Sequence, residues 1–242
     1  MINQPHWTLS EDGAYLAGAE DNAAYHICKR LMDLVLGLGL LILLAPLMLL
    51  IAVCIKLDTS GPVLFVQPRV GARRRSQPGM QRWDIVTFPC YKFRSMMHNA
   101  DTALHREHIR AFVEGELSGA ETDHARFKLG EDPRITRVGK YLRLSSLDEL
   151  PQLLNVIKGD MSLVGPRPVP TYEVEQYQDW HYGRLAALPG ITGYWQIKGR
   201  GSSTFEEMIA MDVDYIAQRS LGMDLQLLLS TIPAVLTRRG AR

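Results

Sequence analysis

Residues 34–55 read LVLGLGLLILLAPLMLLIAVCI, 22 consecutive positions without a charged side chain. Leucine, isoleucine and valine dominate this stretch, and its length reaches the roughly 20 residues that an apolar helix needs to cross a bilayer. It begins too late in the chain, and is too long, to be a cleaved signal peptide. The stretch therefore predicts a helix inserted into a membrane.

Pro46 lies inside this stretch, directly after Ala45. A proline within a helix removes a backbone donor and collides with the carbonyl four residues earlier, here that of Ile42. We therefore expect the helix to break or kink at Ala45 and Pro46. The two arms would be about 18 and 14 Å long, and each alone is too short to cross a hydrocarbon core of about 30 Å.

Basic residues flank the stretch on both sides. The flanking residues are Lys29 and Arg30 before it, and Lys56, Arg69, Arg73, Arg74, Arg75 and Arg82 after it. Because cytoplasmic flanks of membrane helices are rich in Lys and Arg, this pattern places both ends in the cytoplasm, as a re-entrant hairpin requires. Proline is also tolerated in true spans, so charge alone leaves the hairpin and a single crossing equally open.

Charge and cysteine content indicate which partners and which cellular compartment the protein can have. The 242 residues include 27 basic and 26 acidic side chains, a formal net charge of +1, which argues against a nucleic-acid partner. Cys28, Cys54 and Cys90 form no C-x-x-C pair and no zinc-ligand spacing, so we expect reduced cysteines, as in a protein that faces the cytosol.

We divide the chain into a polar arm (1–28), a membrane hairpin (29–57) and a cytosolic-face core (58–242) that forms one functional domain with the hairpin. The arm is acidic, lacks Lys and Arg, and is expected to be loosely ordered. Within the core, the segments Val63–Val66 and Trp83–Phe88 predict the strands of a small hairpin.

Three further segments predict helices: Asp101–Leu117, Asp148–Ile157 and Leu221–Leu236. The last of them has leucines on one side and arginines just beyond it, which suits an amphipathic helix on an anionic membrane surface, although core packing explains the leucines equally well. Together these elements predict a mainly α protein with a small β-hairpin, in the α+β class, with interfacial amphipathic helices.

Histidines are spaced along the first of these helices. His105 and His108 are three residues apart, with His98 seven residues before His105. A metal site is one interpretation. Because the sequence shows no fixed fourth ligand, a solvated helical face is the better one.

Asp148 and Glu149 are adjacent carboxylates at the start of a predicted helix. Asp148 could simply cap the helix, with Pro151 tolerated in the first turn, and spacing alone favours this interpretation. The same position would keep Asp148 ionised and attract phosphate, as a nucleophile or a metal ligand requires. Attack by a carboxylate on phosphorus gives an acyl phosphate and needs a divalent cation or arginines to screen the charges.

Candidate phosphate-binding residues are Lys92 and Arg94 in YKFRSM, Arg143, Arg167 in GPRP, and Arg200 in PGITGYWQIKGRG (189–201). Prolines on both sides restrict Arg167, which could bind phosphate bidentately or point to solvent from a turn. The glycine-rich loop suits a nucleotide base and diphosphate, but it matches no Walker or dinucleotide template and is equally an ordinary tight loop.

Taken together, these features resemble the bacterial sugar transferase family, the monotopic phosphoglycosyl transferases that begin capsule, O-antigen, exopolysaccharide or glycoprotein glycan synthesis. The resemblance covers residues 28–236. Its motifs are KR (29–30), the hydrophobic segment, YKFRSM (91–96), DPRIT (132–136), SLDELPQ (146–152), KGDMSLVGPRP (158–168) and PGITG (189–193).

The resemblance implies a re-entrant helix broken at Ala45-Pro46, at the cytoplasmic face of the bacterial inner membrane. It also implies a ping-pong reaction in which Asp148 attacks the sugar-bearing phosphate of a UDP-sugar and releases UMP. Undecaprenyl phosphate would then accept the phosphosugar from the aspartate. By the same resemblance, Asp148 and Glu149 hold Mg²⁺, and Arg143 and Arg167 bind phosphate.

The chain departs from a minimal family core in several places. Its arm (1–28) and the segment 98–127 are longer, and Trp195 stands where a small residue is commoner before Gln196. We expect no counterpart here of the additional transmembrane helices and nucleotide-fold domain of larger relatives. The sequence does not decide whether the transferred sugar is glucose, galactose or an N-acetylated amino sugar, or whether the protein forms a homo-oligomer. Two other functions also stay open: a non-catalytic membrane scaffold, and a bitopic enzyme that acts on a soluble phosphosugar.

Overall fold

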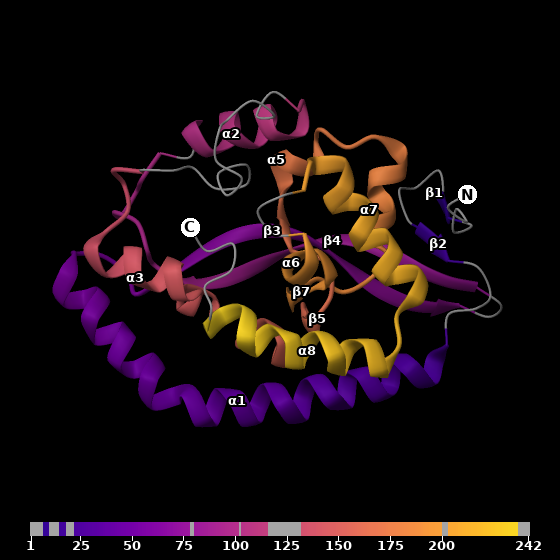
Figure 1. Ribbon diagram of the computed structural model, residues 1–242, viewed down its shortest axis with the longest axis horizontal. Coiled ribbons are helices and arrows are strands. Elements are labelled where there is room, and N and C mark those ends of the chain that lie inside the picture. The colour runs from indigo at the N-terminus through magenta and orange to yellow at the C-terminus, as the bar shows by residue number, and fades with distance from the viewer. Residues whose placement is uncertain are drawn as a thin grey trace.

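The computed structural model describes residues 7–9, 15–17, 22–77, 80–101, 103–115, 132–199 and 203–236. A long β-hairpin runs through the middle of the molecule, with helices α1 and α8 on one side and α2 on the other (Figure 1). The helical segments in chain order are α1 (Ala23–Asp58), α2 (Ala103–Val113), α3 (Arg137–Ser145), the 3-10 helix η2 (Leu147–Glu149), α4 (Gln152–Lys158), α5 (Thr171–Val174), the 3-10 helix η3 (Asp179–Leu185), α6 (Tyr194–Lys198), α7 (Phe205–Gln218) and α8 (Leu221–Leu236).

The hairpin predicted from the sequence is confirmed, and its strands are longer than expected. The strands β3 (Leu64–Gln77) and β4 (Met80–Phe93) pair antiparallel along their whole length. Shorter strands extend this sheet at both edges in the order β1-β2-β4-β3-β6, and β5 pairs with β7 in parallel. These strands are β1 (Trp7–Leu9), β2 (Tyr15–Ala17), β5 (Ser162–Val164), β6 (Val169–Pro170) and β7 (Gly190–Thr192).

Two expectations change in the structure. Part of the arm predicted to be loosely ordered, residues 7–9 and 15–17, forms strands because the edge of β4 offers backbone partners that local sequence does not reveal. The single helix expected over 148–157 is divided into η2 and α4, which are separated by Pro151.

Helix α1 begins at Ala23, before the predicted boundary at Lys29. Asn22 caps this start, because its side chain accepts a hydrogen bond from the N–H of Ala24 at 2.9 Å. The chain stays helical through Ala45 and Pro46. The helix bends partway along its length (Figure 1). Proline removes one backbone hydrogen bond, and the remaining bonds keep the helix continuous, so the expected break takes the form of a bend.

The N-terminal part of α1 is held to the rest of the fold by buried polar contacts. Lys29 Nζ lies 2.9 Å from Asp224 Oδ2 on α8. The Asp33 carboxylate accepts hydrogen bonds from Ser162 Oγ at 3.0 Å and from the N–H of Leu163 at 2.9 Å. The side chains of Asp33 and Asp224 are almost fully buried, so these contacts fix the helix on β5 and α8.

The C-terminal part of α1 is held by apolar packing instead. Ile51 and Ile55 pack in one cluster with Phe93 at the end of β4 and Leu142 on α3. Between the two ends, Leu41 packs against the largest core cluster, which joins the hairpin to α4, β5, α7 and α8. The helix therefore contacts the core along most of its length.

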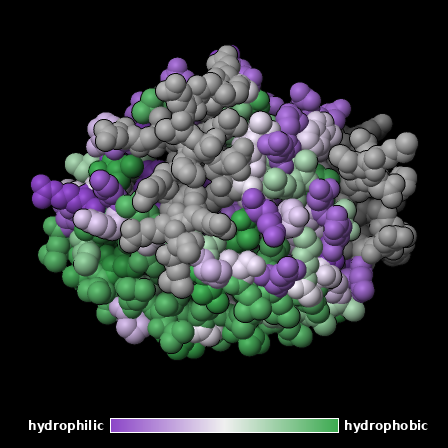
Figure 2. Space-filling view, viewed as in Figure 1, coloured by the Kyte–Doolittle hydropathy of each residue, from purple (hydrophilic) through white to green (hydrophobic). Residues whose placement is uncertain are grey.

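The outer face of α1 and α8 is apolar and exposed, and it forms a continuous band along the lower side of the molecule (Figure 2). Its exposed members include Ile27, Leu31, Val35, Leu43, Leu49 and Leu57 on α1, and Leu225, Leu229 and Ile232 on α8. Among the described helices, α1 alone is long and apolar enough to cross a bilayer, and little of its apolar stretch is buried. On α8, Leu227 is buried, so this helix has both the core face and the surface face that the sequence suggested.

Candidate active site

The acidic pair lies on a short turn between two helices. Helix α3 ends at Ser145, and Ser146 adopts a left-handed conformation (φ 58°) that starts η2 directly. Asp148 and Glu149 lie on η2 and are partly exposed. Asp148 does not occupy the N-cap position of α4 that the capping interpretation gave it, because this position belongs to Pro151. The pair is therefore positioned by the turn and accessible to a ligand.

Lys92 is brought next to this pair by the end of β4. Its Nζ donates a hydrogen bond to Glu149 Oε1 at 2.7 Å. The two side chains are 17% and 29% exposed, so solvent screens this ion pair less than it screens a surface pair. The structure thus places one predicted phosphate ligand beside the predicted acidic pair.

Arg94, the other basic residue of the YKFRSM motif, is directed elsewhere. Its guanidinium is buried and donates to the carbonyl oxygens of Ser60 at 2.6 Å and Thr59 at 2.7 Å. These contacts close the turn after α1. The structure therefore gives Arg94 an anchoring role, and phosphate binding by this residue stays a prediction.

Arg167 shares the neighbourhood of Lys92 and Glu149 around the buried thiol of Cys90. Burial raises the pKa of Cys90, and the charge of Glu149 adds to this rise. The charges of Lys92, Arg69 and Arg167 act on the same pKa in the opposite direction. Four charged groups from β3, β4, η2 and the segment after β5 thus gather on one region of the hairpin.

Arg143 lies in the last turn of α3, near the DPRIT motif. Arg134 binds Asp132 through two hydrogen bonds, with Nη2 to Oδ2 at 2.7 Å and Nε to Oδ1 at 2.8 Å. The pKa of Asp132 is lowered mainly by these hydrogen bonds, and the positive charge of Arg143 lowers it as well. Arg143 is therefore close to a second basic residue, Arg134.

His105 on α2 lies beside the same basic groups. Burial is the main cause that lowers the pKa of His105 to about 4, and the charges of Arg69 and Arg167 contribute to this lowering. Its ring nitrogen Nδ1 shares a hydrogen bond with the hydroxyl of Tyr172. The expectation of a solvated histidine face is thus wrong for His105, because α2 packs against α5.

In the sequence, Arg69 is recognisable only as one of the basic residues that flank the apolar stretch. In the structure Arg69 is 6% exposed and donates to the carbonyl oxygen of Pro168, one residue after Arg167. Its place next to the site could have been found only from the pairing of β3 with β6, which joins Arg69 to Pro170.

The glycine-rich loop supports the segment that carries Arg167. The N–H of Gly190 donates to the carbonyl of Pro166 at 2.8 Å, and a Cβ on Gly165 would meet the backbone of Gly190. Close backbone packing thus explains the first glycines of this loop. Arg200, the candidate phosphate ligand at its far end, lies outside the described residues.

The acidic pair provides a donor set that fits a magnesium ion bound together with substrate. Mg²⁺ is typically held by one or two carboxylates, with phosphate oxygens and waters completing the octahedron. Asp148 and Glu149 supply two carboxylates on one turn. Among the residues that the structure describes, no three His, Cys, Asp or Glu side chains cluster into a metal cage.

The sequence is similar to several known proteins over most of its length. It is 40% identical over 215 residues to the exopolysaccharide production protein ExoY of Sinorhizobium fredii, covering 89% of this chain and 88% of that protein. It is 40% identical to the undecaprenyl-phosphate galactose phosphotransferase of Salmonella typhimurium, covering 88% of this chain and 41% of that protein.

A third relative is the UDP-glucose:undecaprenyl-phosphate glucose-1-phosphate transferase of Caulobacter vibrioides, 39% identical over 232 residues, or 93% of this chain and 75% of that protein. Residues 24–238 match the family described as Bacterial sugar transferase. This match includes α1, the hairpin, the acidic turn and α8. The chain therefore belongs to the bacterial sugar transferase family.

Proposed function

We propose that this protein transfers a sugar-1-phosphate from a UDP-sugar to undecaprenyl phosphate and releases UMP, as the initiating step in the synthesis of an exopolysaccharide or related glycan. The names of its relatives support transfer of a sugar phosphate to the lipid carrier. The observation that carries the proposal is the pair Asp148 and Glu149, held beside Lys92 in a fold with an apolar outer face on α1 and α8.

The proposed reaction has two displacements at the same phosphorus atom. A carboxylate oxygen of Asp148 attacks the phosphorus that bears the sugar, and the bond to the UMP oxygen breaks. A phosphate oxygen of undecaprenyl phosphate then attacks this phosphorus, and the bond to Asp148 breaks. The products are UMP and a lipid diphosphate sugar, and the carboxylate is restored.

The basic side chains around the acidic turn would screen the repulsion between an anionic nucleophile and an anionic donor. Lys92 holds Glu149, Arg167 adds positive charge near the same part of the hairpin, and Arg143 adds it from the last turn of α3. A magnesium ion held by Asp148 and Glu149 would supply additional screening of the phosphate charge.

The packing of α1 supports a re-entrant helix at the cytoplasmic face of the inner membrane. Polar contacts of Lys29 and Asp33 fix one end of α1, and the packing of Ile55 fixes the other end to the same core. A helix that crossed the bilayer while attached in this way would pull the buried charges of the core into lipid, which is costly. The apolar outer face therefore suits partial insertion with both ends on one side.

The proposal is tested with purified protein in nanodiscs, Mg²⁺, undecaprenyl phosphate and separate UDP-glucose, UDP-galactose and UDP-N-acetylamino-sugar donors. We expect one donor to give UMP and an extractable lipid product, and Asp148→Asn to abolish both. Without acceptor, intact mass spectrometry should detect a phosphosugar adduct that Asp148→Asn lacks.

A matched control is Asp214→Asn, because Asp214 is an exposed carboxylate on α7 away from the turn. This variant should keep wild-type turnover. Lipid labelling that persists in Asp148→Asn would overturn the nucleophile assignment. No UMP release from any donor would instead favour a membrane-anchored scaffold without catalysis.

A further inference from the structure

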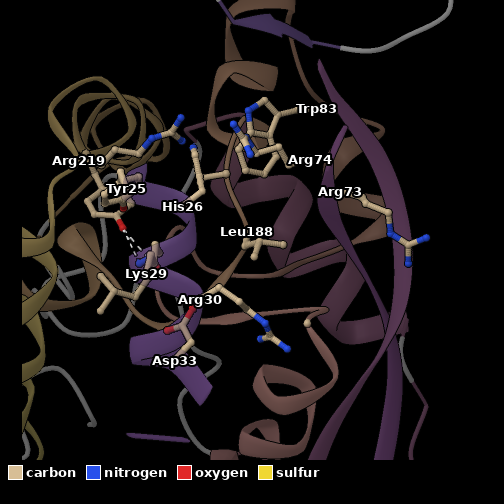
Figure 3. Close-up of a pocket in the computed structure, with 14 residues that line it drawn as sticks. Tyr25, His26, Lys29, Arg30, Asp33, Arg73, Arg74, Trp83, Leu188 and Arg219 are labelled. Atoms are coloured by element: carbon tan, nitrogen blue, oxygen red, sulfur yellow. Dashed lines mark hydrogen bonds between the residues drawn. The ribbon is translucent and has the colours of Figure 1, made fainter. Parts of the chain in front are cut away.

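A cavity of about 230 Å³ lies beside the first turns of α1, away from the acidic turn. Val164, Ala187 and Leu188 contribute apolar walls, and side chains from α1, β3 and β4 surround the rest (Figure 3). Neither Asp148 nor Glu149 lines it. The cavity is therefore separate from the proposed transfer site.

The charged lining of this cavity is mainly basic. Its basic side chains are Lys29, Arg30, Arg73, Arg74 and Arg219, and Asp33 is the single acidic residue among the lining residues described. The Asp33 carboxylate already accepts hydrogen bonds from Ser162 and Leu163. Lys29 is balanced by Asp224 at 2.9 Å. The arginines therefore determine the sign of the potential in the cavity.

Two of these arginines have no carboxylate partner within the described part of the chain. Arg30 donates to the carbonyl oxygens of Val156 at 2.6 Å and Ile157 at 2.8 Å, which satisfies donors without neutralising the charge. The side chain of Arg73 is exposed and makes no hydrogen bond or ion pair with the described residues. Like charges gathered in one place repel one another, so an anion in the cavity would stabilise the arrangement.

Trp83 adds an unsatisfied donor to the same cavity. Its side chain is 2% exposed, and its Nε1 has no hydrogen-bond partner among the described residues. The Arg219 guanidinium lies 5.6 Å from the ring centroid of Trp83, and His26 lies next to it (Figure 3). Indole Nε1 can only donate, and a buried donor without an acceptor is costly.

We propose that this cavity is a binding site for a phosphate group, which accepts hydrogen bonds from Trp83 and balances the charges of Arg30 and Arg73. The site lies at the edge of the apolar face, because Ile27 and Leu31 on the same turns of α1 are 63% and 57% exposed. Two sources can supply this chemistry: the headgroup of an anionic phospholipid, or a soluble phosphate.

The experiment follows the indole N–H signal of Trp83 by ¹⁵N NMR in the full chain with ¹⁵N-labelled tryptophan. One arm titrates inorganic phosphate into protein in a neutral detergent. The other compares nanodiscs of phosphatidylcholine with nanodiscs containing phosphatidylglycerol. Trp83→Phe identifies the signal, and if this variant does not fold, substitutions of the other tryptophans identify it by elimination.

The Trp83 signal should move downfield in at least one arm, while those of Trp180 and Trp195, which do not line the cavity, should stay in place. Arg73→Ala should weaken the binding affinity that this signal reports by about tenfold, as expected for loss of a charge-assisted contact. Arg137→Ala, at an exposed arginine of α3, is the matched control and should leave it unchanged.

A response to inorganic phosphate alone assigns the site to a soluble ligand, and a response to phosphatidylglycerol alone assigns it to a lipid headgroup. Either outcome supports the proposal. A Trp83 signal that moves in neither arm, or that responds equally in Arg73→Ala, overturns it. The result is independent of the transfer reaction, because no catalytic turnover is measured.

Discussion

Lys92 Nζ and Glu149 Oε1 lie 2.7 Å apart and join the end of the β-hairpin to the turn that carries Asp148. The two residues are 57 positions apart in sequence, and the fold brings β4 and η2 into contact. Both side chains are largely shielded from solvent. This ion pair is therefore expected to position the acidic pair more firmly than a typical surface salt bridge would.

Replacing Lys92 by methionine should lower turnover of the UDP-sugar by roughly 10- to 100-fold, because Glu149 loses a charged partner worth about 1–3 kcal/mol. Lys92→Arg, which keeps the charge, should retain more activity. The measurement is UMP release at saturating donor, with folding checked by thermal unfolding. Equal activity of wild type and Lys92→Met would show that the ion pair does not contribute.

Asp33→Ala should lower the free energy of unfolding by about 1–3 kcal/mol, because the Leu163 N–H and Ser162 Oγ would be left buried without their acceptor. Ser162→Ala removes only one of these hydrogen bonds and should cost less. Chemical unfolding in a mild detergent measures both variants. If Ser162→Ala were the more destabilising of the two, Asp33 would not be the main anchor of α1.

Gly165→Ala should destabilise the fold, because its Cβ would collide with backbone atoms of Leu188 and Gly190. Overpacking of this kind typically costs about 1–3 kcal/mol. Gly222→Ala on α8 is the matched control, since its Cβ would meet nothing within 4 Å and alanine favours a helix. The unfolding midpoint should fall for Gly165→Ala and stay or rise for Gly222→Ala.

His105 makes stability sensitive to acid. Its pKa is lowered from 6.5 to about 4, so between these values the unfolded chain binds a proton that the folded chain does not. Stability contributed by neutral His105 is therefore present above pH 6.5 and is lost as the pH falls toward 4, by at most about 1.4 kcal/mol per pH unit.

His105→Gln removes this group, so its stability should fall less steeply than that of the wild type between pH 6.5 and 4. Above pH 7 the two proteins should show the same dependence on pH. Urea unfolding at several pH values in one detergent provides the comparison. Parallel curves throughout the acid range would exclude a contribution from His105.

The re-entrant topology predicts that the two ends of α1 label from the same side of the membrane. In a background without native cysteines, Asn22→Cys and Thr59→Cys flank the helix at its two ends. Both should react with an impermeant maleimide in inverted inner-membrane vesicles and be protected in intact spheroplasts. Opposite behaviour of the two positions would establish a single crossing.

Much of the fold follows from local patterns. The apolar segment predicts α1, and the strand candidates around the Arg-rich turn predict the hairpin, because hydrophobic runs and turn residues act over short distances. The limits of the elements were less predictable. The start of α1 at Ala23 and the division between η2 and α4 depend on Asn22 and Pro151, which are weak signals beside the longer hydrophobic pattern.

The candidate site was predicted unevenly. Asp148, Glu149 and Lys92 could be chosen from the sequence, and the structure brings Lys92 to Glu149. The separation of Lys92 from Arg94 could not be predicted, because the two are neighbours in one motif and their directions depend on where β4 ends. The role of Arg69 likewise depends on strand pairing.

By itself, the sequence determined that one helix would be apolar and bent, that basic residues would flank this helix, and that two acidic residues would be adjacent, because these properties belong to short stretches of chain. Only the tertiary structure decided how these parts meet. The contacts of Asp33 with Ser162 and of Lys29 with Asp224 join residues 129 and 195 positions apart. Such partners are selected by the packing of the whole core, and no local pattern encodes them.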